Sequence, residues 1–592
     1  MPKLHAVSNQ ELAGILSEIA TYLNMQGVAW KPRAYEKAAE LIAGMDEELS
    51  GIYEKGGVQA LKELPGVGIA IAEKLEELFK TGRSQYYEKL RKAVPVKLGE
   101  LRAVQGLGPK SIAKLYARLG VKDLRDLERA AKSGKLAQLE GFGAKSEENI
   151  LQSIAFVRGG GGRQPIFLAL PQVRRIEALL KKHPAVSRIT VAGSTRRMKE
   201  TIGDVDMLVV SARPNMVMEH FVSLPGVARI YARGDTKSSV LFRSGLQADL
   251  RVVPAESYGA ALNYFTGSKD HNVAMRQLAI AKGLKLNEYG LFASADRRGQ
   301  ARGQTRTGRM VAGKTEEEIY KALGLRYIEP ELRENTEELE ASRRGTLPNL
   351  IGYNDLRGDL QTQSEWTDGK DSIETMAKAA AAKGLEYIAI TDHTHSLTIT
   401  NGLDEKRIQK QWTEIDRVNK KCQASGIKCR VLKGTECDIL PDGRLDLPDA
   451  VLAKLDVVGV SVHSHVKLSR KAQTERIIRA IENPHVDILF HPTGRIVGKR
   501  PPYEVDMEAV FKAAKRTGTI LEVNATERLD LKDEYVRMAV SAGVKLAINS
   551  DAHTATGIGE CEFGIAQARR GWAEKKDIVN TRPLEEMRKT LK

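Results

Sequence analysis

Two carboxylates interrupt an apolar strand in the stretch V-A-G-S-T-R-R-M-K-E-T-I-G-D-V-D-M-L-V-V, residues 191–210. Alternate residues of a strand point to one face, so Asp204 and Asp206 project together from an otherwise hydrophobic run. Adjacent carboxylates repel one another and are costly to desolvate unless a cation lies between them. Mg²⁺ prefers such oxygen ligands, and two-metal phosphoryl-transfer sites are built from them. The stretch therefore predicts a metal site for phosphate chemistry.

The residues around this acid pair supply further groups for phosphate. Gly193 and Ser194 form a turn that offers backbone N–H groups and a hydroxyl, and either Arg196 or Arg197 offers a guanidinium fork. A later strand-like run, Q-A-D-L-R-V-V, adds Asp249 as a third acid. In the competing interpretation these acids are turn and surface residues, but the combined pattern favours the metal site.

Charge and composition narrow the class of protein. The chain has 592 residues, a formal net charge of +16 and a pI of about 9.4, which predicts several domains and a polyanionic partner. Aromatic residues make up only 5%, which favours contact with a duplex backbone over base stacking. The four cysteines form no C-x-x-C pair. The first residues hold no signal segment and no apolar run reaches membrane-spanning length, so we expect a cytoplasmic protein without a membrane partner.

An apolar residue between two glycines recurs at three expected helix junctions: G-V-G, G-L-G and G-F-G. Glycines allow a DNA backbone to approach closely, and the N–H groups at a helix start bind phosphate. The alternative is three structural turns, since glycine caps are common. The pattern resembles the helix-hairpin-helix motif, which binds DNA without reading its sequence. The glycines concerned are Gly66, Gly68, Gly106, Gly108, Gly141 and Gly143.

The acid stretch, the later D-L-R and the downstream Y-F-T-G-S turn together resemble family X DNA polymerases, the group that includes vertebrate polymerase beta. The resemblance implies that Asp204 and Asp206 each ligate two Mg²⁺ or Mn²⁺ ions and that Asp249 ligates the catalytic one. A tandem aromatic beneath the sugar favours deoxynucleotides. Gln247 and Lys269 depart from the beta-type pattern. The nucleotide-binding residues implied are Gly193, Ser194, Arg197, Gly203, Tyr264, Phe265, Gly267, Asn272 and Arg276.

The same resemblance extends to a deoxyribose-phosphate lyase in the N-terminal helices. Lys74 matches the Schiff-base lysine, and Lys31 and Tyr35 match residues that hold the 5′-phosphate of DNA. Ala70 and Trp30 depart from the beta-type enzyme, which has a lysine and a histidine there. We expect DNA binding by these helices, and lyase activity stays an open alternative to a solvated surface lysine.

From about residue 351, short β-runs alternate with helices, which predicts a parallel barrel. Acids and histidines follow the ends of these runs, where barrel ligands gather. The set resembles the PHP (polymerase and histidinol phosphatase) domain, a distorted barrel that holds up to three ions, here Zn²⁺ or Mn²⁺, and acts as a 3′→5′ exonuclease in family X enzymes. The metal ligands implied are Asp368, His393, Glu436, His463, His491, Asp551 and His553.

The first PHP motif departs from the family. It normally reads D-x-H-x-H, but here it is Asp359-Leu360-Gln361-Thr362-Gln363. A carboxamide oxygen is a poorer ligand than imidazole for such metals. The first metal site, on the two glutamines with Glu436 and Asp551, is therefore expected to be weak. The second (Asp368, His393, His553) and third (Glu436, His463, His491) are expected to be intact. A two-metal nuclease, a non-catalytic scaffold and a changed metal specificity all stay open.

We therefore expect a multidomain α+β protein: a helical helix-hairpin-helix region, a nucleotidyltransferase palm with a mixed sheet, a small α/β thumb and a distorted (β/α) barrel of PHP type. The expected function is a monomeric DNA-directed polymerase that uses deoxynucleoside triphosphates on gapped or primer-template DNA in repair. Three alternatives stay open. The chain is mainly a metal-dependent DNA phosphoesterase, or a polymerase with a catalytically inactive PHP scaffold, or an enzyme that adds nucleotides without a template. The expected boundaries are 1–92 (lyase-like), 93–157 (second DNA-binding subdomain), 158–260 (palm, after a G-G-G-G linker), 261–329 (thumb), 330–350 (linker) and 351–592 (PHP).

Overall fold

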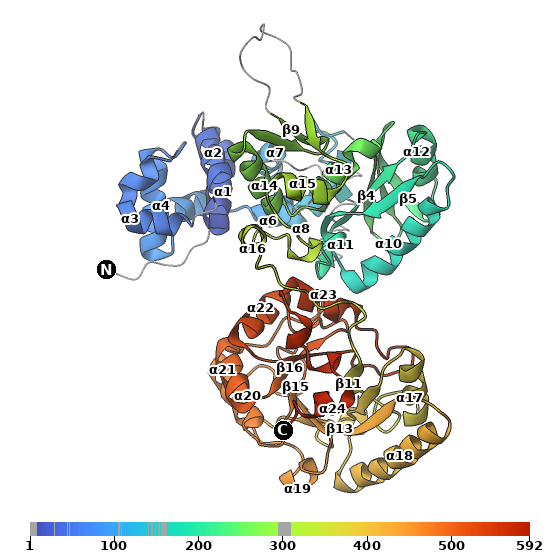
Figure 1. The fold of residues 1–592 in the computed structure, drawn as a ribbon. Helices are drawn as coiled ribbons and strands as arrows, with labels where there is room; N and C mark the ends of the chain where they lie inside the picture. Colours follow the sequence, from blue (N-terminus) through green and yellow to red (C-terminus); the bar gives the residue numbers. More distant parts are fainter. Residues whose placement is uncertain are drawn as a thin grey trace. The chain divides into compact units, whose positions relative to one another are not determined.

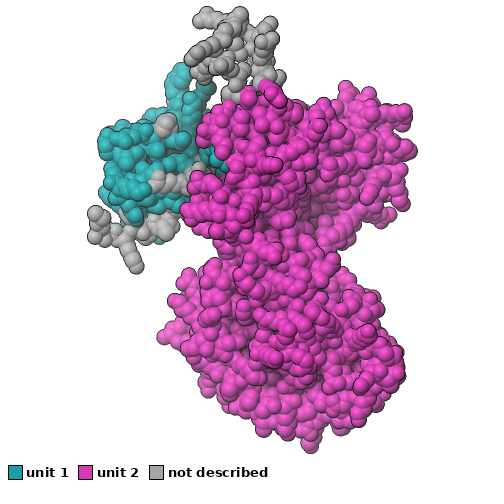
Figure 2. Space-filling view, viewed as in Figure 1, with its two compact units in different colours: residues 1–163, 272–278 teal, residues 164–271, 279–592 magenta. Residues whose placement is uncertain are grey.

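The chain forms two compact units in the computed structural model: residues 1–163 with 272–278, and residues 164–271 with 279–592 (Figure 2). The structure describes residues 9–154, 163–293 and 309–592, apart from residues 29, 44, 46, 47, 65, 103, 105, 106, 108, 140, 144, 145, 148, 149, 152 and 153. The predicted glycine linker at 159–162 and the predicted DNA-binding glycines Gly106 and Gly108 lie outside the described residues.

The first unit is helical. Leu12, Leu16 and Ile19 recur at helical spacing and are buried, so they anchor a core to which the described helices of residues 9–132 contribute. These helices are α1 (Asn9–Met25), α2 (Lys31–Ala43), α3 (Leu49–Lys62), α4 (Ile69–Thr81), α5 (Gln85–Ala93), α6 (Leu98–Arg102), α7 (Pro109–Leu119) and α8 (Leu124–Lys132) (Figure 1).

A mixed five-stranded sheet organises the start of the second unit, in the order β2-β4-β7-β6-β5. The strands are β2 (Arg188–Val191), β4 (Asp204–Val210), β5 (Val227–Arg233), β6 (Lys237–Phe242) and β7 (Gln247–Val252). Helices α10 (Ile166–Lys181) and α12 (Pro214–Val222) supply the apolar residues that cover one face, and α13 (Tyr258–Thr266) packs on the other (Figure 1). Two short strands, β1 (Gln164–Pro165) and β3 (Thr201–Ile202), form a separate antiparallel pair.

A small α/β region follows, with a three-stranded antiparallel sheet in the order β10-β9-β8. Its elements are α14 (Lys269–Ala281), β8 (Leu284–Asn287), β9 (Gly290–Ala293), β10 (Met310–Ala312) and α15 (Glu316–Ala322). The segment predicted as a linker contains η2 (Pro330–Leu332) and α16 (Glu338–Arg344). Arg333 and Glu338 in it are fully buried, so this segment is packed structure as well as a connection.

Seven parallel strands form the C-terminal barrel, in the order of the chain from β11 to β17. A bridge between Thr362 and Ala552 joins its first and last edges, which nearly closes the sheet. The interior is filled by side chains: a Cβ on Gly459 would lie 1.8 Å from the ring of Phe490, so only glycine fits there. The strands are β11 (Gly358–Thr362), β12 (Tyr387–Ile390), β13 (Arg430–Asp438), β14 (Val457–Ser461), β15 (Ile488–Leu489), β16 (Ile520–Asn524) and β17 (Leu546–Asn549).

Helices follow most of these strands, as a βα barrel requires. They are α17 (Ile373–Ala382), α18 (Glu405–Ala424), α19 (Asp449–Leu452), α20 (Arg470–Ile481), α21 (Met507–Thr517), α22 (Asp533–Ala542), α23 (Glu562–Arg570) and α24 (Leu584–Arg588). The four cysteines are buried and free, in line with the sequence. In the described part of the chain, no helix has both the length and the apolar character needed to cross a membrane. The predicted fold class is confirmed.

Candidate active site

The palm sheet brings the three predicted acids together. Strands β4 and β7 run parallel, and their register pairs Asp206 with Asp249. The apolar neighbours of these acids, such as Val205 and Leu250, point into the core under α10 and α12. Because side chains alternate along a strand, the acids share the opposite face, where Leu208 packs against α13. Three carboxylates from two adjacent strands thus gather at one edge of that core.

The electrostatics of this cluster fit a cation. Burial, with the neighbouring charges of Asp204 and Asp249, raises the pKa of Asp206 to about 7. Arg251 and Lys237 lower this pKa but do not offset the repulsion. A divalent ion bound between these carboxylates would offset the repulsion that raises the pKa of Asp206. The donor set, three carboxylates, is the one that hard divalent ions prefer.

Gly193 is required by close packing on the acid pair. It begins a single helical turn, α11 (Gly193–Arg196), with a left-handed φ of +64°. A Cβ at this position would lie 2.8 Å from Oδ2 of Asp206. The glycine therefore lets the backbone and Ser194 approach the carboxylate of Asp206. Gly203 directly precedes Asp204, between β3 and β4.

The two arginines of α11 and its cap share Thr266 as a partner but pair with different carboxylates. Arg196 makes a bidentate ion pair with Glu316, at 3.0 and 2.7 Å, and Glu316 also pairs with the buried Arg333. Arg196 is thus held by α15. Arg197 donates from Nε to Glu334 at 3.0 Å and from Nη1 to the carbonyl of Thr266. Both arginines contact Thr266, Arg196 at its hydroxyl at 2.7 Å and Arg197 at its carbonyl, and Arg197 also lies against Gly267 of the predicted sugar-gating turn.

That turn follows α13. Tyr264 and Phe265 end the helix with their rings edge to face at 5.0 Å, and Arg251 lies 4.4 Å from the centre of the Phe265 ring. Gly267 has a φ of +69°, and a Cβ there would lie 3.1 Å from Nη1 of Arg197. The aromatic pair, the glycine and the arginine therefore adjoin one another. Asn272 and Arg276 lie one turn apart on α14, where Arg276 Nε donates to the carbonyl of Asn272 at 3.1 Å.

Two residues that contact Asp249 were not predicted from the sequence. The antiparallel register of β6 and β7 pairs Ser239 with Asp249, and the serine hydroxyl donates to Oδ1. Lys237 on the same strand lies 3.6 Å from Oδ2. The pattern K-S-S-V-L-F predicts a strand, but it does not predict which other strand pairs with it. These contacts orient the side chain of Asp249 on β7.

The glycine motifs share one geometry. The N–H of Val67, Leu107 and Phe142 donates in each case to the carbonyl three residues earlier, and each of these apolar side chains is buried. Gly66 and Gly141 have the same φ of +88°. Among the described residues, no heavy atom lies within 4 Å of a Cβ built on Gly66, Gly68, Gly141 or Gly143, so that part of the chain does not pack against these glycines.

The predicted lyase residues meet around one ring in the first unit. Lys74 on α4 lies 4.5 Å from the centre of the Tyr86 ring, and Tyr35 on α2 stacks on the same ring at 6.4 Å. Lys74 also donates to the carbonyl of Ala70 at 2.8 Å. Partial burial, with the nearby charge of Lys31, lowers the pKa of Lys74. A lysine with a lowered pKa is a better nucleophile at neutral pH.

The barrel gathers the predicted PHP ligands at the carboxyl ends of its strands. Two groups of side chains could hold a metal ion in the described part of the chain: Asp368 with His393 and His553, and His393 with Glu436 and His463. The first group corresponds to the predicted second site. The second group contains His393 where the predicted third site has His491. His491 still lies next to this group, with its Nε2 atom 2.8 Å from Oε1 of Glu436.

The residues expected to hold the first metal form hydrogen bonds with one another and with Asn524. Gln361 and Gln363 both donate from Nε2 to Oε2 of Glu436, at 3.0 and 2.9 Å. The amide of Asn524 donates to Asp551 Oδ2 at 3.1 Å. The nitrogens of both glutamines thus turn toward the acid that a metal would use. Gln363 Oε1, however, is buried without a hydrogen-bond partner among the described residues, and an oxygen is what a hard metal would need.

The histidines of this cluster differ in pKa: neighbouring carboxylates raise it for His463 and His553, whereas burial and the charge of Arg528 lower the pKa of His491 to about 4. Burial lowers the pKa of His463, but Asp438 and Glu436 raise it to about 10. Burial lowers the pKa of His553, but Asp368 and Asp551 raise it to about 9. Burial alone would raise the pKa of Glu436, yet the histidines around it hold that pKa well below its ordinary value. A divalent cation would stabilise the same carboxylates, so these residues fit a metal centre.

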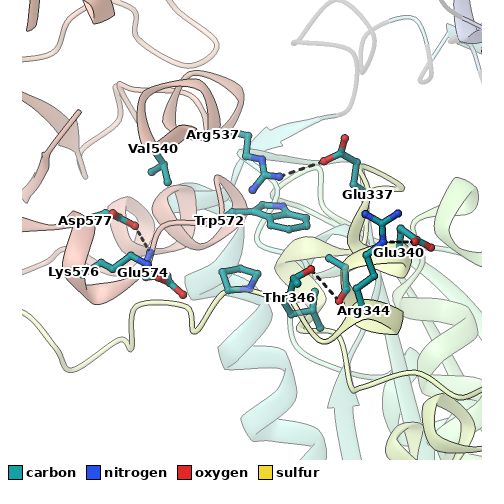
Figure 3. A pocket seen from close by; sticks show the side chains of 13 residues that line it. Glu337, Glu340, Arg344, Thr346, Arg537, Val540, Trp572, Glu574, Lys576 and Asp577 are labelled. Carbon is teal, nitrogen blue, oxygen red and sulfur yellow. Dashed lines mark hydrogen bonds and ion pairs between the residues drawn. The ribbon is translucent and has the colours of Figure 1, made fainter. Parts of the chain in front are cut away.

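A cavity of about 720 Å³ is lined by α16 and the residues after it on one side, and by α22 and residues 572–577, which follow α23, on the other (Figure 3). Its charged side chains are paired: Arg537 with Glu337 at 3.5 Å, and Arg344 with Glu340 at 2.6 Å. Arg537 also stacks on Trp572 at 3.7 Å. None of the acids of the palm or barrel clusters lines this cavity, so we do not assign an active site to it.

Four family models match separate parts of the chain. A helix-hairpin-helix domain matches residues 7–84, and a SAM-like helix-hairpin-helix tandem matches 98–155. The DNA polymerase beta thumb matches residues 261–334, and the PHP domain matches 359–526. The fold and these matches define a nucleotidyltransferase joined to a PHP barrel.

Relatives identify the family. The chain is 38% identical over 587 residues to the DNA polymerase/3′-5′ exonuclease PolX of Bacillus subtilis, covering 98% of this chain and 99% of that protein. It is 26% identical to DNA polymerase lambda of Rattus norvegicus over 55% of this chain and 56% of the relative. It is 31% identical to a probable phosphatase of Thermoanaerobacter sp. (strain X514) over 36% of this chain and 84% of the relative. The chain belongs to the family X DNA polymerases with a C-terminal PHP domain.

This result confirms the resemblance drawn from the sequence, including its helix-hairpin-helix and PHP parts. Family X polymerases act on DNA, and the families concerned work with divalent metal ions.

Proposed function

We propose that the chain is a DNA-directed DNA polymerase that fills short gaps during DNA repair, with Mg²⁺ or Mn²⁺ at the palm. The observation that carries the proposal is the register that sets Asp206 beside Asp249 on the face shared with Asp204. The relatives named as DNA polymerases support the same reaction. The substrates are deoxynucleoside triphosphates and gapped or primer-template DNA, and the enzyme acts as a monomer in the cytoplasm, where the chromosome of a prokaryote lies.

The palm residues divide the work of nucleotidyl transfer. Divalent ions, when bound, would supply Lewis-acid stabilisation and a more acidic primer 3′-hydroxyl. Asp204 and Asp206 would hold both ions, and Asp249, oriented by Ser239, would hold the one beside that hydroxyl. The 3′-oxygen then attacks the α-phosphorus in line, and pyrophosphate leaves.

The residues around the acids bind and select the nucleotide. Ser194, Gly203 and Arg197 would bind the triphosphate. Tyr264, Phe265 and Gly267 would lie beneath the sugar and exclude a 2′-hydroxyl. Asn272 and Arg276 on α14 would reach the new base and the template strand.

The main alternative makes the chain chiefly a metal-dependent DNA phosphoesterase. A primer bordering a short gap separates the two functions in one assay with Mg²⁺ and all four deoxynucleotides. The polymerase lengthens the primer, whereas a phosphoesterase shortens it or removes a terminal phosphate. Shortened products alone, across the accessible pH range, would refute the polymerase proposal.

For the barrel, we propose Zn²⁺ or Mn²⁺ at Asp368, His393 and His553 and at the cluster around Glu436, with Asp551 and the glutamines left without a strongly bound first metal. The hydrogen bonds from Gln361 and Gln363 to Glu436 support this proposal. A weakened 3′→5′ exonuclease follows from it. A non-catalytic scaffold and a changed metal preference through Gln363 Oε1 are the alternatives.

A lyase activity is a second candidate function, favoured by the lowered pKa of Lys74 beside the Tyr86 ring. Lys31 and Tyr35 would hold the 5′-phosphate. We expect Lys74→Ala to lose at least about ten-fold in borohydride-trapped adduct with DNA that carries a 5′-deoxyribose phosphate. Lys80 on the same helix is paired with Glu76 at 2.9 Å, so Lys80→Ala is the matched control and should keep the adduct. Equal trapping by both variants would refute the assignment.

A further inference from the structure

A carboxylate at the end of the thumb region is shared by cations from two parts of the second unit. Oε1 of Glu334 lies 3.0 Å from Nε of Arg197, 3.1 Å from Nη1 of Arg570 and 3.7 Å from Nζ of Lys199. Arg197 and Lys199 belong to the palm, whereas Arg570 ends α23 of the barrel. Burial alone would raise the pKa of Glu334, but these cations lower it, so it stays ionised.

Arg570 is held firmly on the barrel side of this cluster. Its Nε and Nη2 contact Oδ2 of Asp533, at the start of α22, at 2.8 and 2.7 Å. Its side chain is only 3% exposed. Its Nη1 also donates to the backbone carbonyls of Arg197 at 2.8 Å and Glu331 at 3.4 Å. A planar guanidinium fixed at several points cannot follow a moving partner, so Arg570 is a stationary counter-charge for Glu334.

We propose that Arg570 is a positioning residue for nucleotide binding at the palm: by sharing Glu334 with Arg197, it leaves the Arg197 guanidinium able to bind the triphosphate. The inference rests on the proposed polymerase function. Arg197 must loosen its bond to Glu334 when it binds phosphate, and the carboxylate it leaves would then be buried and poorly paired. Arg570 and Lys199 remain to satisfy it. Without Arg570, Glu334 holds Arg197 more tightly, and the nucleotide competes less well.

The location of Arg197 restricts the effect to the nucleotide. Its guanidinium donates to the carbonyl of Thr266 and lies against Gly267, in the turn that follows the aromatic pair. Arg570 contacts none of the three metal-binding acids. Loss of Arg570 should therefore raise the KM for the deoxynucleotide and leave kcat and the affinity for DNA nearly unchanged.

The test uses neutral replacements of matched size in the full chain, with steady-state incorporation on gapped DNA. For Arg570→Gln we expect KM to rise roughly three- to thirty-fold, with kcat within about two-fold of wild type. Glu334→Gln should leave KM at or below the wild-type value. The double variant should return KM to near wild type, because the competing charge is gone. Arg174→Gln breaks an ion pair between α10 and Glu562 of the same helix α23, 2.9 Å long, and should change nothing.

Each other outcome overturns the inference. An unchanged KM in Arg570→Gln means that Arg570 does not act on Arg197. A raised KM that Glu334→Gln does not restore, or a fall in kcat with a lower melting temperature, means that Arg570 only stabilises the fold. If Arg570→Gln does not fold, Arg570→Lys takes its place: it keeps the charge with fewer hydrogen bonds, and a rise in KM that Glu334→Gln does not reverse overturns the inference. Failure of the wild-type chain to incorporate nucleotides refutes the polymerase function instead.

Discussion

Asp206→Ala should abolish nucleotide incorporation while the protein stays folded. Asp206 shares its strand face with Asp204 and pairs in register with Asp249, and burial with their charges raises its pKa to about 7, so of the proposed ligands it is the one for which we expect a cation to be most needed. Metal ions contribute several kcal/mol to such reactions, which corresponds to a loss of roughly a thousand-fold in kcat. The measurement is single-turnover incorporation on a gapped duplex, with a melting curve for each variant.

The control separates this loss from damage to the fold. Asp235 is an exposed acid of the same domain, and Asp235→Ala should keep wild-type activity. Removing Asp206 also removes repulsion, so Asp206→Ala should melt no lower than wild type when no divalent metal is present. Substantial incorporation by Asp206→Ala would show that the acids of β4 and β7 are not the catalytic metal site.

The second large effect is a gain. Replacing Gln361 and Gln363 together with histidine should raise Mn²⁺-dependent 3′→5′ degradation of single-stranded DNA by roughly ten- to a hundred-fold, the range over which metal-site changes alter affinity or activity. The two hydrogen bonds to Glu436 Oε2 would be lost, and two imidazole ligands would take their place. Metal analysis should find about one more ion bound per chain.

The same assay tests which metal group the wild-type barrel uses. His553→Ala, which removes a ligand of the Asp368 group, should abolish degradation in both the wild-type and the restored background. Degradation by wild type at the level of the restored variant would show that the glutamines do not weaken the site. No degradation by either, with the extra ion bound, would favour the scaffold interpretation.

Local patterns were enough to predict most of the fold. Alternation of apolar residues along β4 and β7 predicts both strands and the face shared by their acids, since the period of a strand leaves no other choice. Strand runs alternating with helices likewise predict the parallel barrel. The packing of segment 330–350 could not be predicted in this way. Its charges predict a linker, but Arg333 and Glu338 are buried and form ion pairs with Glu316 and His271, which lie elsewhere in the chain.

The supporting residues of the site could not be predicted, because each depends on a contact between distant parts of the chain. Ser239 orients Asp249 only through the register of two strands. Glu334 reaches Arg197 across 137 positions, and Arg570 reaches the same carboxylate across 236. No local period marks such pairs. The ligand types at the barrel were readable from the sequence, whereas the hydrogen bonds that close the first metal position were not.

Templated gap filling is tested by offering each deoxynucleotide separately to the wild-type chain on DNA with a one-nucleotide gap, in the presence of Mg²⁺. We expect that only the nucleotide complementary to the template base is added efficiently, and that a gap with a 5′-phosphate is filled well because the N-terminal helices bind DNA. Equal addition of all four nucleotides, or addition without a template, would contradict gap-filling synthesis. So would the absence of any addition.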